Sequence, residues 1–183
     1  MSMQTFFLER LETPTGTMCL VTDKERRLRA ADWEDCDARM HGLVRRYYGA
    51  DTQLRDAPRR SQAAQALSAY FDGELDAIAS LPTAANGTAF QLSVWAALRR
   101  IPVGQTISYG ALAARIGRPK AVRAVGLANG ANPIAIVVPC HRVIGADASL
   151  TGYGGGLNRK RWLLAHERGG RPLLDEARPE AVR

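Results

Sequence analysis

The order of its short apolar segments most constrains how this 183-residue chain can fold. β-Branched and apolar runs come first, at residues 5–8, 18–22 and 28–33, and they predict three short strands separated by turns. From residue 35 onward, apolar side chains recur at three- and four-residue spacings, which predict helices at 35–48 and 61–71. Strands followed by helices favour an α+β fold, with a small sheet domain first and a mainly helical domain after it.

The second half of the chain contains helical segments interrupted by turn residues. An amphipathic segment at 88–100 ends before Pro102 and Gly104. Ser108 is positioned to cap a helix at 109–116, and Gly117 breaks it. Pro119 suits the first turn of a further helix that continues through residues 120–128. Two short helices around a glycine-containing turn predict a helix-turn-helix.

Charge divides the chain at Gly87. Residues 1–87 contain 11 basic and 13 acidic residues, a net charge of −2, whereas the remainder contains 14 and 5, a net charge of +9. We therefore expect domains at 1–87 and 88–168, and a mobile tail rich in charge and proline at 169–183. Residues 99–161 alone have ten basic side chains and one acidic one. That excess favours binding to a polyanion, and a solvated basic face that maintains solubility is the alternative.

The hydrophobic content of 46% is enough for a buried core, but no apolar run approaches the 18 or so residues that span a bilayer. The N-terminus lacks the pattern of a secretory signal, so we expect a cytoplasmic protein that does not enter membranes. Cys19, Cys36 and Cys140 are odd in number and far apart, which argues against disulfides and CxxC sites. A metal site at Cys36 and His41 would lack two ligands, so we expect no metal, and Cys19 and Cys36 to be packing residues.

Cys140 has the most distinctive surroundings of the three. The β-branched run at 134–138 predicts a buried strand, and Pro139-Cys140-His141-Arg142-Val143 follows directly. An imidazole and a guanidinium beside the thiol make an electropositive setting that favours the nucleophilic thiolate. The alternative is that Cys140 is a small buried packing residue.

The predicted second helix of the helix-turn-helix has small residues at 121, 124, 126 and 128, and its long polar side chains are Lys120 and Arg123. Such a helix can approach another surface closely. Tight packing against a neighbouring helix and contact with DNA both fit this pattern, and the surrounding positive charge favours DNA.

Several motifs in residues 90–167 occur together in a characteristic order. They are Ile107-Ser108-Tyr109-Gly110, Arg123-Ala124-Val125-Gly126, Asn132-Pro133, Pro139-Cys140-His141-Arg142-Val143, Tyr153-Gly154-Gly155-Gly156-Leu157 and Trp162-Leu163-Leu164-Ala165-His166-Glu167. In this combination the chain resembles the methylated-DNA–protein-cysteine methyltransferase family, most closely the bacterial Ogt class. The first half resembles the family's N-terminal domain at residues 13–16 and 28–33, which implies a ribonuclease H-like sheet.

The resemblance implies a reaction in which an alkyl group passes from double-stranded DNA to the protein. The substrate would be O6-alkylguanine, with O4-methylthymine as a lesser one, and Cys140 the acceptor. His141 would act on Cys140 through a bridging water, Glu167 would orient His141, and Asn132 would belong to a hinge. Because the thioether product is stable, each molecule would react once and need no cofactor.

The resemblance also implies how the lesion is held outside the duplex. Arg123 would fill the place of the flipped nucleotide while Tyr109 turns its phosphate. The carbonyls of Cys140 and Val143 would accept from the guanine amine, with Tyr153 and Gly154 near the alkylated oxygen. The remaining DNA contacts are expected from Arg118, Lys120, Ala121 and Ala124.

Ala135 and Gly154 stand where some relatives have proline and serine, so the sequence leaves the width of the alkyl pocket open. We expect a monomer without an obligate protein partner, and clustering along DNA stays open. Two rival functions remain at this point. One is a non-catalytic lesion-binding protein or DNA-binding regulator, which the presence of Cys140 disfavours, and the other is a cysteine hydrolase using Cys140 and His141.

Overall fold

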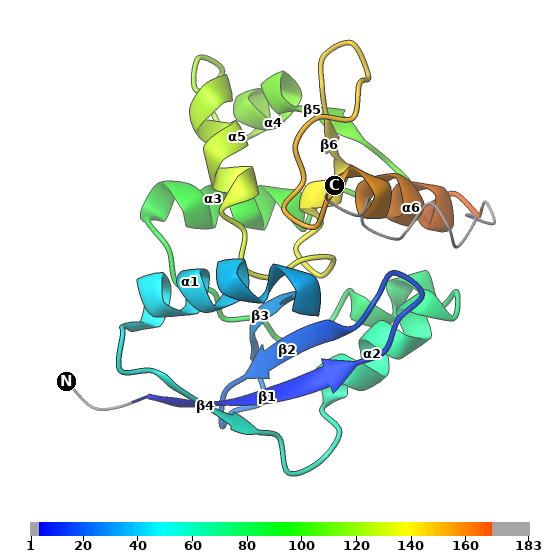
Figure 1. Ribbon diagram of the computed structural model, residues 1–183. Coiled ribbons are helices and arrows are strands. Elements are labelled where there is room, and N and C mark those ends of the chain that lie inside the picture. The colour runs from blue at the N-terminus through cyan, green and yellow to red at the C-terminus, as the bar shows by residue number, and fades with distance from the viewer. Residues whose placement is uncertain (1–3, 170–183) are drawn as a thin grey trace, which may run out of the picture. The chain divides into compact units, whose positions relative to one another are not determined.

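The computed structural model describes residues 4–169 and divides into two compact units (Figure 1). The first unit comprises the chain up to Gly87 together with Pro133–Val137, and the second comprises Thr88–Asn132 and the chain from Val138. The five residues 133–137 therefore group with the first unit, which a single boundary at residue 87 does not anticipate. Except for Gly169, the tail that we expect to be mobile lies outside the described residues.

The first unit is built on a four-stranded sheet of order β3-β2-β1-β4. The strands β1 (Thr5–Leu11), β2 (Met18–Thr22) and β3 (Leu28–Trp33) pair antiparallel, and β4 (Gln53–Asp56) pairs parallel with β1. The apolar pattern of the sequence does not indicate β4, because this edge strand has a single apolar side chain, Leu54, and is mostly exposed. Hydrophobic pattern alone cannot identify such a strand.

Two helices complete this unit. A 3₁₀ turn, η1 (Glu34–Cys36), leads into α1 (Asp37–Tyr48), whose Met40 and Val44 pack on the sheet with Cys19. The second helix, α2 (Gln62–Phe71), packs against β1 and is followed by η2 (Leu75–Ile78). Ser61 caps α2, accepting from the backbone N–H of Ala64 at 3.1 Å.

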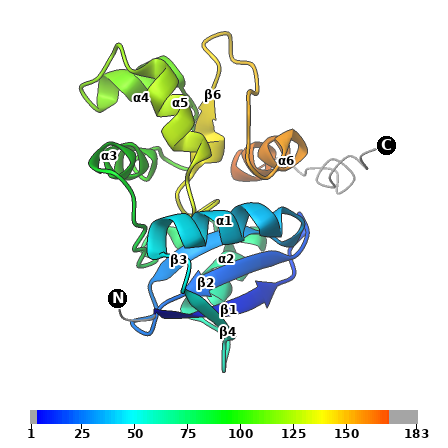
Figure 2. The ribbon, with the colours of Figure 1, turned by 60° about the vertical axis from the view of Figure 1, so that its left-hand side comes forward.

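The second unit contains four helices in its described part. In Figures 1 and 2, α3 (Ala89–Leu98), α4 (Tyr109–Arg115) and α5 (Val122–Gly130) pack together, and α6 (Leu157–Glu167) follows later in the chain. A capping box between Thr88 and Gln91 fixes the start of α3. The short strands β5 (Ile107–Ser108) and β6 (Val143–Ile144) pair in parallel, and η3 (Cys140–Arg142) directly precedes β6.

The helix-turn-helix is present as α4 and α5, but its second helix begins later than predicted. Arg118 and Lys120 lie in the connecting turn, where the N–H of Ala121 donates to the carbonyl of Arg118 at 2.8 Å. Pro119 therefore shapes this turn and is not in the first turn of α5. The helix continues to Gly130, two residues beyond the predicted end.

The prediction of a buried strand at 134–138 is wrong. Ile134 makes an isolated bridge to Ala31, and the chain then turns sharply, with the N–H of Val137 donating to the carbonyl of Ala135 at 2.8 Å. Ile136 has φ of 69°, a left-handed conformation that β-branched residues rarely adopt. All five side chains are nevertheless buried. The apolar run therefore indicates that the segment is buried, but not that its backbone is extended.

The α+β class, with a sheet domain first and a helical domain second, is confirmed. Within residues 4–169, no helix is both long and apolar enough to cross a membrane.

Candidate active site

Cys140 begins the short helix η3 and is 7% exposed. Its N–H donates to the carbonyl of Val138 at 2.8 Å, which makes a tight turn around Pro139 with φ of −80° and ψ of 65°. The side-chain amide of Asn132 donates to Cys140 Sγ at 3.2 Å and to the carbonyl of Val138 at 2.8 Å. Asn132 therefore ties the end of the α5 segment to both the thiol and the turn that presents it.

His141 is fully buried next to the thiol. Its Nε2 lies 2.8 Å from Oε1 of Glu167, at the end of α6, and its Nδ1 has no hydrogen-bond partner among the described residues. Burial lowers the pKa of His141, and the nearby charges of Arg142 and Lys160 lower it further, against the opposing effect of Glu167. The imidazole is therefore held neutral.

Glu167 accepts four hydrogen bonds, which together use both of its oxygens. Arg142 donates to each oxygen at 2.8 Å, His141 shares Oε1, and the N–H of Gly104 donates to Oε2 at 3.2 Å. Burial alone would raise the pKa of Glu167, but its bonds to His141 and Arg142 outweigh that effect and hold the pKa far below the usual range. Arg142 is thus the counterion of Glu167.

The prediction that Arg142 makes the surroundings of the thiol electropositive is wrong, because Arg142 pairs with Glu167. Arg142 also donates to the carbonyl of Ile101 at 2.6 Å, so its guanidinium faces Glu167 and a backbone oxygen. Lys160 is a further buried cation of this unit: burial lowers its pKa, and the charge of Cys140 opposes that effect without cancelling it.

Lys160 is the residue that sequence reasoning missed. Its side chain is fully buried, and Nζ donates to the carbonyls of Val143 at 2.6 Å and Thr151 at 2.8 Å. In the sequence it stands in the basic run 159–161, which looks like exposed charge. Three of the ten cations counted in residues 99–161 are in fact buried, namely Arg142, Arg159 and Lys160.

A second missed residue is Asn129, near the end of α5. Its Nδ2 donates to the carbonyl of Cys140 at 3.4 Å, and it is buried. No sequence signal identified it, because an asparagine near a helix end is ordinarily a cap. Together with Asn132, it connects α5 to the backbone and side chain of Cys140.

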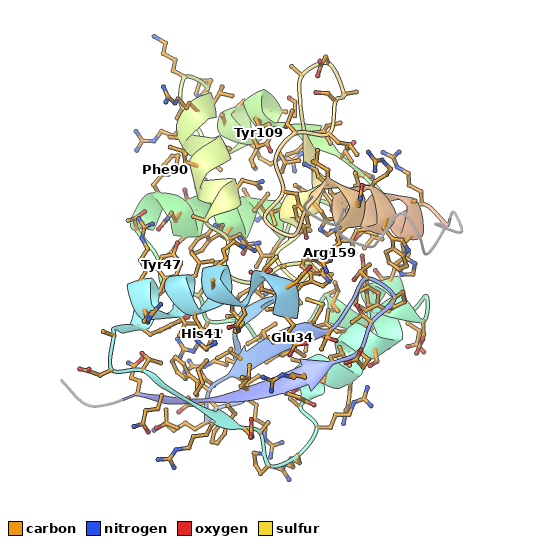
Figure 3. All side chains as sticks on the ribbon, viewed as in Figure 1. Glu34, His41, Tyr47, Phe90, Tyr109 and Arg159 are labelled. Carbon is orange, nitrogen blue, oxygen red and sulfur yellow. The ribbon has the colours of Figure 1, made fainter. Side chains whose placement is uncertain are left out.

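The residues expected to contact DNA lie on the exposed side of the helix-turn-helix. Arg123 and Ala124 are exposed on α5, and Arg118 and Lys120 are exposed in the turn, with Ala121 half-buried beside them. Tyr109 begins α4, and its ring would be 3.9 Å from a β-carbon at Gly126 of α5 (Figure 3). Tyr153 is half-buried and Gly154 exposed, in the segment that joins β6 to α6.

The other two cysteines differ in their burial. Cys19 is buried in the core of the first unit, as predicted for a packing residue, and burial raises the pKa of its thiol. Cys36 is only half-buried, and His41 pairs with Asp37 at 3.0 Å. Within residues 4–169, no group of three or more His, Cys, Asp or Glu side chains could hold a metal ion.

Comparison with known proteins identifies the family. The model of the 6-O-methylguanine DNA methyltransferase DNA-binding domain matches residues 89–169, and that of the family's ribonuclease-like domain matches residues 8–85. The chain therefore belongs to the 6-O-methylguanine DNA methyltransferase family, and the ribonuclease-like first domain implied by the resemblance is confirmed.

Relatives and solved structures agree with this assignment. A methylated-DNA–protein-cysteine methyltransferase of Salmonella typhimurium is 52% identical over 87% of this chain and 94% of its own length. One of Mycolicibacterium paratuberculosis is 60% identical over 67% of this chain and 74% of its own length. The structure of the Mycobacterium tuberculosis OGT in complex with DNA has a TM-score of 0.76 and 40% identity, covering 94% of this chain and 98% of that one.

Proposed function

We propose that this protein repairs DNA by transferring the alkyl group of O6-methylguanine, and secondarily of O4-methylthymine, to its own Cys140. A bond forms between Cys140 Sγ and the methyl carbon as the bond from that carbon to the guanine oxygen breaks. The guanine leaves with the electron pair and takes up a proton. The observation that carries the proposal is a buried thiol that accepts a hydrogen bond from Asn132 and is followed in the chain by His141, which is paired with Glu167.

The hydrogen bonds around His141 support its role as the base. Because Glu167 is ionised and acts only as an acceptor, the proton of the neutral imidazole resides on Nε2. The lone pair on Nδ1 is then available to take the Cys140 proton through a bridging water. Asn132 and the buried cation Lys160 would stabilise the thiolate as it forms.

The damaged base must leave the helix to reach a thiol this deeply buried, at a cost of a few kcal/mol that is smaller for a mispaired base. We assign this task to the helix-turn-helix, with Arg123 filling the vacated place and Tyr109 turning the phosphate. The carbonyls of Cys140 and Val143 would accept from the guanine amine. The bond from Lys160 to the Val143 carbonyl would fix the position of that acceptor.

Tyr153 and Gly154 complete the proposed pocket around the alkylated oxygen. Arg118, Lys120, Ala121 and Ala124 would contact the DNA backbone and the minor groove, with the protein acting as a monomer. A cytoplasmic location belongs to the same proposal, because the reaction needs a free thiol and disulfides are rare in that compartment.

The experiment that tests this function counts transferred label. The protein is incubated with duplex DNA that contains one radiolabelled O6-methylguanine, and label is measured on protein and on DNA. We expect transfer to saturate near one equivalent, to vanish in Cys140→Ala, and to persist in Cys36→Ala as the matched control. Label released beyond one equivalent would indicate a hydrolase, and label retained on bound DNA would indicate a lesion-binding protein. Either result would overturn the proposal.

A further inference from the structure

Leu127 is exposed in a way that is unusual for a large apolar side chain. Its relative exposure is 70%, whereas Val122, Leu92 and Leu157, the other exposed large apolar residues of the described chain, lie near 41–42%. Leu127 belongs to α5, the helix that carries Arg123. An apolar side chain held this far into water on a rigid helix is a candidate contact for a partner.

Leu127 and Arg123 project from the same side of α5. Four residues along a helix advance the chain by about 6 Å and rotate it about 40° beyond a full turn, so the two side chains are neighbours. The opposite side of the helix, which includes Val125, Ala128 and Asn129, is buried in the second unit. The exposed residues are thus Val122, Arg123, Ala124, Leu127 and Gly130.

The residues beside Leu127 on this side of the helix are small. Ala124 and Gly130 are exposed, and Gly126 is half-buried beside the ring of Tyr109. Leu127 therefore protrudes from a surface that is otherwise low, one turn beyond Arg123. Apolar side chains that protrude in this way can press between or against bases in the minor groove and favour an unstacked, bent duplex.

We propose that Leu127 is an apolar DNA contact that holds the duplex open beside the place filled by Arg123. This inference rests on the proposed function. Arg123 would fill the vacated position, and Leu127 would pack against the sugars and base edges one helical turn away. Because that contact is apolar, it adds to binding without adding to its salt dependence, unlike Lys120 or Arg118.

The test compares Leu127→Ala with Leu92→Ala, which removes the same atoms from an equally apolar but less exposed position on α3. Rates of methyl transfer are measured on duplex DNA and on free O6-methylguanine base. Removing three carbon atoms that are half-buried in the groove should slow the duplex reaction about tenfold. The ratio of duplex to free-base rate should fall by that factor in Leu127→Ala and stay unchanged in Leu92→Ala.

A second measurement separates this inference from the proposed function. Binding of an undamaged duplex is followed by fluorescence anisotropy over a range of roughly 50 to 300 mM salt, across which screening of exposed charges increases. It should weaken in Leu127→Ala at every salt concentration, with an unchanged slope. If wild-type protein transfers no label, the proposed function fails, while this binding measurement still tests Leu127. An equal loss of duplex and free-base rates, or binding equal to that of Leu92→Ala, would overturn the inference.

Discussion

Replacing Glu167 by glutamine should disrupt the buried network behind the thiol. The carboxylate accepts four hydrogen bonds, two from Arg142 and one each from His141 and Gly104. A glutamine offers one oxygen and one NH₂ group in the same space, so one side of the side chain would oppose two donors. It would also leave the buried Arg142 without a counterion.

The expected size of this effect follows from burial. Removing one partner of a buried ion pair costs about 3–5 kcal/mol, because the remaining charge is left uncompensated. Loss of the carboxylate also removes the group that fixes the proton of His141 on Nε2. In a comparable histidine–carboxylate pair, the change from carboxylate to amide slows the reaction on the order of 10⁴-fold.

Two measurements check this prediction. Urea unfolding should show Glu167→Gln to be less stable by about 3–5 kcal/mol, and single-turnover transfer from duplex DNA should be slowed much more than DNA binding. The control is Glu34→Gln, because Glu34 pairs with Arg10 at 2.9 Å while both side chains are about half exposed. An exposed pair of this kind contributes about 0–1 kcal/mol. If Glu167→Gln costs no more stability than Glu34→Gln, the buried network does not stabilise the site.

Three further predictions test neighbouring features. The pKa of His141 is lowered from 6.5 in the folded state, so the contribution of its neutral form to folding stability should be fully present above that pH and decline as the pH falls below it. The decline should be smaller in His141→Asn, and urea midpoints at several pH values measure it. Lys160→Met should destabilise the protein by about 2 kcal/mol by leaving the buried carbonyl of Val143 and the partly buried carbonyl of Thr151 without their donor, whereas Arg161→Met, at an exposed neighbour, should not; equal melting temperatures would refute this. Gly104→Ala should lower the melting temperature, since Gly104 has φ of 75° and a β-carbon there would lie 3.0 Å from the carbonyl oxygen of Glu167, while Gly42→Ala in α1 should raise it.

Local patterns in the sequence predicted much of the fold. The strands β2 and β3 match their predicted ranges, and Ser108 caps α4 as predicted. Capping and short-range hydrophobic spacing depend on neighbours a few residues away, so they can be read without the fold. The predicted strand at 134–138 is wrong because a segment buried on all sides has the same apolar run of residues whether its backbone is extended or turned.

The fold class, the family and Cys140 as the proposed nucleophile follow from the sequence alone, because local patterns and short motifs carry this information. The assigned roles of Asn132, His141 and Glu167 stay predictions, although the structure places Asn132 against the thiol of Cys140 and Glu167 against His141, the next residue in the chain.

The arrangement of the charges around η3 can be known only from the folded chain. Arg142 stands two residues from Cys140 in the chain, yet it pairs with Glu167, 25 residues away, whereas Lys160 is buried and donates to the carbonyls of Val143 and Thr151. Such pairings depend on which helix ends meet in the folded unit and on how completely water is excluded there. The sequence therefore shows that a residue is basic, but which group its charge acts on depends on its burial and its partner in the folded protein.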